Sequence, residues 1–100
     1  MNTVIHKHVF NNTDHVQSFA IPVGADILSV RNQRGVLTLW EAHNPETKET
    51  EARTFQLMFT GIETANHQAC LFVGTVQMDD GCVIHVFETS PARRNGITRP

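Results

Sequence analysis

The sequence predicts an all-β fold, a small antiparallel sandwich or open barrel of about seven strands. Apolar and polar residues alternate with a period of two in several short runs that are rich in Val, Ile, Thr and Phe. Gly, Pro, Asn and Asp separate these runs, and no long segment has the period of an amphipathic helix. These three observations favour strands joined by tight turns.

We expect the strands, in chain order, near residues 3–10, 15–21, 26–33, 36–43, 52–60, 70–78 and 82–88. The turn signals between them are residues 11–14, 22–24, 34–35, 44–45 and 79–81. One short helix would fit within residues 45–52, but the crowding of Glu, Lys and Thr there favours an exposed loop. The chain thus divides into a single β domain, residues 1–88, and a basic C-terminal tail, residues 89–100.

The charge distribution limits the classes of ligand. The net charge is −2, but Arg93, Arg94 and Arg99 lie in the tail, so residues 1–88 hold five basic and ten acidic side chains. This acidic body argues against DNA or RNA binding, which needs a broad basic face. A small anionic ligand remains compatible, because two or three arginines in one pocket are enough to hold it.

Nothing in the sequence indicates a membrane or secreted protein. No apolar run is long enough to cross a bilayer, and the N-terminus lacks the apolar core of a secretory signal. We therefore expect a cytoplasmic protein without a membrane partner. Its two cysteines, Cys70 and Cys82, are expected to be free thiols because the hairpin register separates them by about 25 Å.

The hairpin at residues 34–35 defines two faces. Pairing Gln33 with Val36 predicts a core face with Leu28, Val30, Asn32, Leu37 and Leu39. The reverse face then holds Ser29, Arg31, Gln33, Thr38 and Trp40. An aromatic ring beside arginine, amide and hydroxyl groups suits a stacked planar ligand. The alternative is a second apolar layer, since Ile27 and Ala42 are expected on that face too, and a one-residue slip would exchange the faces.

The last hairpin has its turn at residues 79–81. Its register pairs Met78 with Cys82, Val76 with Ile84 and Gly74 with Val86, and this apolar face is expected in the core. The other face is mixed and holds Val73, Thr75, Gln77, Val83, His85 and Phe87.

Three further groups have a chemical and a structural interpretation. His6 and His8 share a strand face and could bind zinc with His15, although a polar edge strand is the simpler explanation. Cys70 and Cys82 could be nucleophiles with His85, but a core cysteine is much more common. Arg53 lies on the apolar stripe of Phe55, so it needs an anionic ligand or a salt bridge to Glu41 or Glu51. No acid–base pair or catalytic motif is evident, so an enzyme is not expected.

Several blocks resemble a family of short tailed-phage proteins. They are residues 21–30, Gln33, residues 39–40, 44–45, 53–55, 60–61, 72–77 and 85–88. The resemblance spans residues 3–88. The chain departs from the family pattern at residues 59–62, where the family has a sequence similar to Thr-Gly-Thr/His-Gly. It extends to the phage anti-CBASS sponge proteins, which bind a cyclic dinucleotide such as cyclic GMP–AMP and withhold it from the host effector without cleaving it.

The resemblance implies a homo-oligomeric protein of the host cytoplasm that needs neither cofactor nor metal. The ligand-binding positions that it implies are Gln33, Trp40, Arg53, Phe55, Thr60, Gly61, Thr75 and His85. Arg34, and by the same argument Arg31, would add positive charge for the phosphates. The main alternative is a small interaction protein that docks on a host or virion protein through a sheet edge. A metal-dependent hydrolase that uses His6, His8 and His15 is the third.

Overall fold

The computed structural model describes residues 2–11 and 14–89, and within them it confirms the all-β prediction with seven strands in two antiparallel sheets. The strands are β1 (Val4–Val9), β2 (Val16–Pro22), β3 (Asp26–Gln33), β4 (Val36–His43), β5 (Thr50–Phe59), β6 (Leu71–Gln77) and β7 (Val83–Glu88). A short 3-10 helix, η1 (His67–Ala69), precedes β6. The loop before β5 contains no helix, as expected, although β5 begins earlier than predicted.

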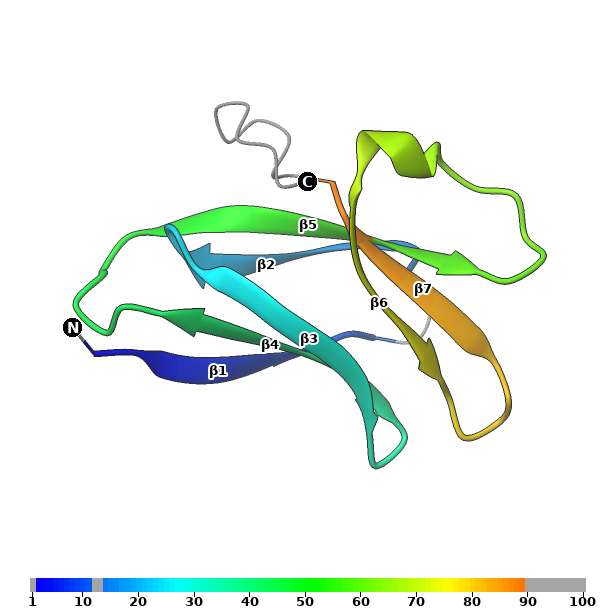
Figure 1. The fold of residues 1–100 in the computed structure, drawn as a ribbon, viewed down its shortest axis with the longest axis horizontal. Helices are drawn as coiled ribbons and strands as arrows, with labels where there is room; N and C mark the ends of the chain where they lie inside the picture. Colours follow the sequence, from blue (N-terminus) through cyan, green and yellow to red (C-terminus); the bar gives the residue numbers. More distant parts are fainter. Residues whose placement is uncertain (1, 12–13, 90–100) are drawn as a thin grey trace.

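The two sheets form the layers of a small sandwich (Figure 1). The three-stranded sheet has the order β1-β4-β3, and the four-stranded sheet has the order β2-β5-β7-β6. Every paired strand is antiparallel to its neighbour. The β3–β4 and β6–β7 hairpins end side by side (Figure 1), where Asn32 Nδ2 donates to Asp79 Oδ1 at 2.8 Å.

The β3–β4 hairpin has the predicted register, with Gln33 opposite Val36. Its two turn residues, Arg34 and Gly35, have φ angles of 53° and 86°, as a type I′ turn requires. The register shifts at a bulge between Ile27 and Ser29, so the prediction fails beyond it. Leu28, expected in the core, is 50% exposed, and Ile27 pairs with a core-facing residue instead of lying on the outer face. A single inserted residue reverses the side-chain alternation of everything before it.

The core lies between the sheets and is built from alternating residues of the central strands. Leu37 and Leu39 of β4 face Phe55 and Leu57 of β5, and all four are almost completely buried. Burying each of these side chains stabilises the fold by about 1.5–3 kcal/mol. The sheets are therefore held together by residues that the alternation alone identifies.

The β6–β7 hairpin also has the predicted register, with Val76 opposite Ile84 and Thr75 opposite His85. A bulge between Phe72 and Gly74 turns Val73, expected on the mixed face, toward the core. Gly74 lies so close to β3 that a Cβ there would be 2.9 Å from Val30 Cγ1. The glycine is thus needed for the close approach of the two sheets.

The described residues include nearly all of the predicted domain, residues 1–88, whereas residues 90–100 of the predicted tail lie outside them. In this described part, no helix combines the length and the apolarity that a bilayer crossing requires. Cys70 and Cys82 are both free thiols.

Candidate functional site

The residues predicted to bind a ligand occupy three separate places. Gln33, Arg34 and Trp40 belong to the small sheet and its hairpin. Arg53 and Phe55 lie between the sheets. Thr60, Gly61, Thr75 and His85 lie at the large sheet, on β6, β7 and the turn after β5. One chain therefore does not bring them together in a single pocket.

The outer face of the small sheet carries the single tryptophan of the chain, and we call it the Trp40 face. Its residues are Ile5, Lys7, Val9, Ser29, Arg31, Gln33, Val36, Thr38, Trp40 and Ala42. Trp40 lies in register between Lys7 of β1 and Ser29 of β3 and is half-buried. No described residue accepts a hydrogen bond from its indole N–H. Within the described part of the chain, every buried side-chain polar atom has a hydrogen-bond partner. The indole N–H has none, so it faces solvent.

A depression of about 460 Å³ opens on this face, toward its β3–β4 hairpin end. Its lining residues are Lys7, Val9, Gln33, Arg34, Val36 and Thr38. Lys7 Nζ donates to Gln33 Oε1 at 3.0 Å across the middle strand, which orients both side chains. Thr38 is completely buried and its hydroxyl donates to Val36 O at 3.0 Å, so that hydroxyl is already used.

Positive charge is concentrated on the Trp40 face. Of the five basic residues in positions 1–88, Lys7, Arg31 and Arg34 are exposed at this face or its hairpin. Arg31 and Arg34 have no ion-pair partner among the described residues. The one carboxylate that the three strands place on this side is Asp26, at the far end opposite Ala42. An acidic protein thus presents a local cationic surface around an aromatic ring.

Arg53 is a core residue rather than an exposed cation. It is 5% exposed, donates from Nε and Nη2 to the carboxylate of Glu88, and donates from Nη1 to Ala25 O at 3.1 Å. Glu51 Oε2 is a more distant partner at 3.8 Å from Nη1. Burial alone lowers the pKa of Arg53, but the hydrogen bonds and charge of Glu88 outweigh it and raise that pKa. Since Phe55 is fully buried as well, neither side chain is free for a ligand.

The salt bridge expected for Arg53 therefore exists, but Glu88 is its main partner. From the sequence, Glu41 or Glu51 was the expected partner. Glu41 is wrong, since both of its carboxylate oxygens contact histidines. Glu88 is adjacent because β7 pairs with β5, a non-local pairing that places Glu88 opposite Phe55.

The third group is built around His85 on the outer side of the large sheet. His85 Nε2 is 2.9 Å from Thr60 Oγ1, and His85 Nδ1 is 3.0 Å from Thr75 Oγ1. Gly61 follows in the turn with a φ of 85°, a conformation that favours glycine. Both imidazole nitrogens are engaged in this hydrogen-bond network, and Cys82, which the sequence suggested as a nucleophile for His85, packs against the core instead.

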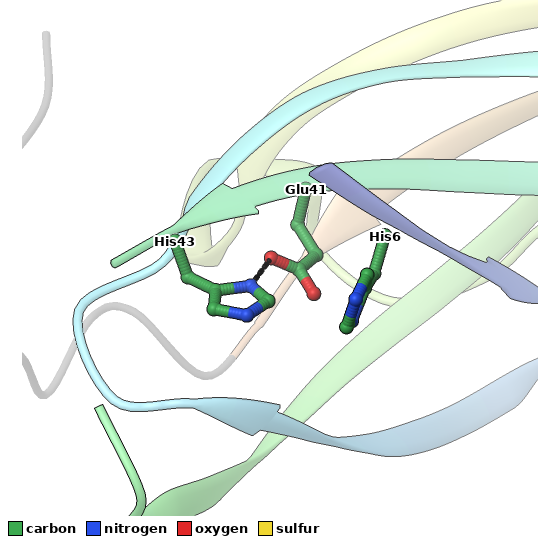
Figure 2. Close-up of side chains that lie close together, drawn as sticks. All are labelled: His6, Glu41 and His43. Carbon is green, nitrogen blue, oxygen red and sulfur yellow. Dashed lines mark hydrogen bonds and ion pairs between the residues drawn. The ribbon is translucent and has the colours of Figure 1, made fainter. Parts of the chain in front are cut away.

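The inner face of the β1–β4 pair holds a histidine–glutamate cluster, His6, His8, Glu41 and His43. Figure 2 shows His6, Glu41 and His43 of this cluster. Glu41 is completely buried, and its Oε1 lies 2.8 Å from His43 Nδ1 while its Oε2 lies 3.1 Å from His8 Nε2. The rings of His6 and His43 meet edge to face with centroids 4.8 Å apart. His6 is exposed, whereas the side chain of His43 is only 7% exposed.

This cluster corrects the expected histidine set. His6 and His8 do share a face, but His15 packs against Phe59 with ring centroids 5.0 Å apart and does not join them. The missing signal was on β4, where Glu41 and His43 share a face that the register places beside β1, with His6 directly opposite Glu41. The His-x-His pattern of β1 and the Glu-x-His pattern of β4 would have indicated the cluster if the pairing of these two strands had been known.

The structure also contains a mainly apolar cavity of about 300 Å³ at the end of the sandwich. Its lining residues are Asn11, Gly35, Leu37, Leu57, Phe59, Met78, Asp79, Asp80, Cys82 and Ile84. The charged groups at this cavity are the carboxylates of Asp79 and Asp80. They repel anions, so this cavity does not suit a phosphate-bearing ligand.

Comparison with known proteins identifies the family of the chain but no activity. Neither the curated proteins nor the solved structures contain a significant match. Residues 1–96 match the model of a family that is described as a domain of unknown function (DUF7352). Because this match covers almost the whole sequence, the chain belongs to the DUF7352 family.

Proposed function

We propose that the protein binds and sequesters a cyclic dinucleotide on its Trp40 face. The observation that carries the proposal is that Lys7, Arg31 and Arg34 lie on the Trp40 face or at its hairpin end, in an otherwise acidic domain whose one tryptophan is on that face. The resemblance to anti-CBASS sponge proteins, in which Gln33 and Trp40 match the implied site, supports the same ligand class. Arg53 and Phe55 are not part of this proposed site because both are buried.

The indole supplies the platform for a base. Stacking of a base on an aromatic side chain is worth about 1–3 kcal/mol, and it needs the ring to be partly open to solvent, as Trp40 is. Gln33 and the indole N–H can form hydrogen bonds with the edge of the base or with ribose hydroxyls. The ring therefore binds the nucleobase while its polar neighbours orient it.

The cations supply the phosphate contacts. Arg31 and Arg34 lie on the same edge of the sheet, and Arg34 lines the depression together with Lys7. Charge-assisted hydrogen bonds to phosphate are about twice as strong as neutral ones. Lys7, Arg31 and Arg34 would hold the phosphates by charge and hydrogen bonding, which is what retention of an uncleaved phosphodiester needs.

The face is open, so one chain covers only one side of a ligand. Ile5, Val9 and Val36 are exposed beside the cations, and this apolar surface suits contact with another protein chain. Two copies facing each other would stack one base each, which matches the two bases of a cyclic dinucleotide. We therefore propose that the ligand is enclosed between two copies of the chain, as a homodimer with two-fold symmetry.

Tryptophan fluorescence tests the proposal directly, because Trp40 is the only tryptophan and the chain contains no tyrosine. We expect a saturable change in Trp40 emission on titration with cyclic GMP–AMP, cyclic di-GMP or cyclic di-AMP. Linear dinucleotides and GMP serve as ligand controls. No emission change and no heat of binding with any of these ligands would contradict the proposal and favour docking on a host or virion protein.

Two variants separate binding from folding. Trp40→Ala is expected to weaken binding by about 2–4 kcal/mol, the effect of a buried hot-spot side chain, when binding is measured by calorimetry. Arg31→Gln is expected to weaken it by about 1.5–3 kcal/mol, the value of a charged hydrogen bond. Lys48→Gln, in the loop before β5, is the matched control and should leave binding unchanged. A loss in Lys48→Gln as large as that in Arg31→Gln would mean that the cations act nonspecifically.

Recovery of the ligand separates sequestration from hydrolysis. After incubation and heat denaturation, chromatography should return the cyclic dinucleotide intact and in the amount bound. Release of a linear product would replace the sequestration proposal with a hydrolase.

A further inference from the structure

We propose that His6, Glu41 and His43 form a binding site for a transition-metal cation, with zinc as the best fit. One ligand atom from each of the three side chains lies within 4.8 Å of the other two (Figure 2). The site is on the inner face of the β1–β4 pair, opposite the Trp40 face. It is argued from its own geometry, so it does not depend on the proposed nucleotide ligand.

The strand pairing preorganises the donors. His6 lies directly opposite Glu41 in the β1–β4 register, and His43 is two residues further along the same face of β4. Zinc bonds of about 2.0–2.2 Å place neighbouring donors roughly 3.3 Å apart. The present separations need only small side-chain rotations to reach that spacing, and His6 can rotate freely because it is exposed.

The charge of Glu41 gives an independent reason to expect a cation. A fully buried carboxylate is strongly destabilising unless a positive charge compensates it. Among the described residues Glu41 contacts no lysine or arginine, and its partners are the imidazoles of His8 and His43. A cation bound between Glu41, His43 and His6 supplies the missing charge at the place where the carboxylate needs it.

The donor set selects the class of ion. Two imidazoles and one carboxylate suit zinc and related transition metals, whereas calcium and magnesium prefer oxygen ligands. Bound zinc takes the place of the hydrogen bond between His43 Nδ1 and Glu41 Oε1, because the atoms that ligate a metal must carry no proton. His8 then remains hydrogen-bonded to the second oxygen of Glu41, the outer-shell contact that typically orients a metal ligand. Three protein ligands leave a fourth position for water at the exposed side of His6.

Calorimetric titration with zinc chloride tests the site, using the full chain without a polyhistidine tag after removal of metals by chelation. We expect one zinc ion per chain and a higher melting temperature in the presence of zinc. Cobalt(II) should give the visible absorption of a four-coordinate ion, and zinc should abolish it. Less than one ion per chain, or a melting temperature that zinc does not raise, would overturn the proposal.

Variants locate the ion. His6→Ala is expected to weaken zinc binding by at least about tenfold, and its circular dichroism should be unchanged because His6 is exposed. His15→Ala is the matched control, since it removes an exposed imidazole that lies outside the cluster, and zinc affinity should not change. His8→Ala should weaken binding less than His6→Ala, as expected of a supporting contact. An affinity that His6→Ala leaves intact, or that His15→Ala lowers equally, would place the ion elsewhere.

Discussion

The two buried glutamates, Glu41 and Glu88, are stabilised in different ways. Glu88 is 4% exposed and forms a two-pronged ion pair with Arg53, whose charge is permanent. Glu41 is fully buried, and its oxygens contact only imidazoles among the described residues. One carboxylate thus has a permanent counter-charge among the described residues, and the other has none.

This difference distinguishes a structural ion pair from a candidate site. Each nitrogen of the Arg53 guanidinium donates a hydrogen bond, to Glu88 or to Ala25 O. The imidazoles around Glu41 are weaker partners, and His6 remains exposed beside them. Groups that are buried but not compensated by a permanent charge are where ligands bind, because a ligand can lower their free energy.

The largest expected effect is that of Glu88→Gln. The substitution leaves the Arg53 guanidinium buried without its main counter-charge, which costs about 3–5 kcal/mol. Chemical denaturation of the variant and of the natural protein measures the difference in free energy of unfolding. A loss below 1 kcal/mol would mean that Glu51 compensates Arg53 instead.

A smaller effect is expected for Glu41→Gln, the same substitution at the other glutamate. The amide can still hydrogen-bond to His8 and His43, and no permanent charge is left unpaired, so we expect a loss of about 1 kcal/mol. The melting temperature of the variant should no longer respond to zinc. If the free energy of unfolding fell as much as in Glu88→Gln, the two glutamates would not differ, and Glu41 would have a permanent positive charge beside it.

Arg34→Asn is expected to stabilise the fold slightly. Arg34 occupies a left-handed backbone conformation with a φ of 53°, in a turn position that favours Asn. Thermal unfolding should show a gain of roughly 0.5–1 kcal/mol, while affinity for the proposed cyclic dinucleotide falls. A gain in the free energy of unfolding together with a loss of affinity would identify Arg34 as a ligand-binding residue. A loss of unfolding free energy would contradict this and indicate a structural contact of the Arg34 side chain.

Arg31→Gln should have the smallest effect on stability. In contrast to Arg53, Arg31 is exposed and has no ion-pair partner among the described residues, so the free energy of unfolding should change by less than about 0.5 kcal/mol. Denaturation alongside Arg53→Gln provides the direct contrast between the two arginines. Equal losses would show that exposure does not separate their roles.

Most of the fold could be predicted from local patterns. Alternation identified the strands, and the turn residues Arg34 and Gly35 gave the register of the β3–β4 hairpin. The errors follow from the bulges in β3 and β6, which turned Leu28 outward and Val73 inward. A bulge leaves little trace in composition, so strict alternation carried the prediction past it.

The candidate sites were predictable only in part. The grouping of Arg31, Gln33 and Trp40 on one face follows from hairpin register and is present in the structure, whereas their ligand stays a prediction. The histidine–glutamate cluster was only half visible, because His43 reaches His6 through a pairing between strands far apart in the chain. The set implied by resemblance scattered over three places, since residues close in a motif can face different sides of a sheet.

The strands, their turns and the two faces of each hairpin as far as its bulge follow from the sequence alone, because these depend on neighbours within a few residues. Which distant strands pair, and therefore that Arg53 meets Glu88 while Glu41 meets histidines, is visible in the tertiary structure alone. The physical reason is that the partner of a buried charge is chosen by burial and strand pairing. Both depend on the whole sandwich and leave no local pattern in the chain.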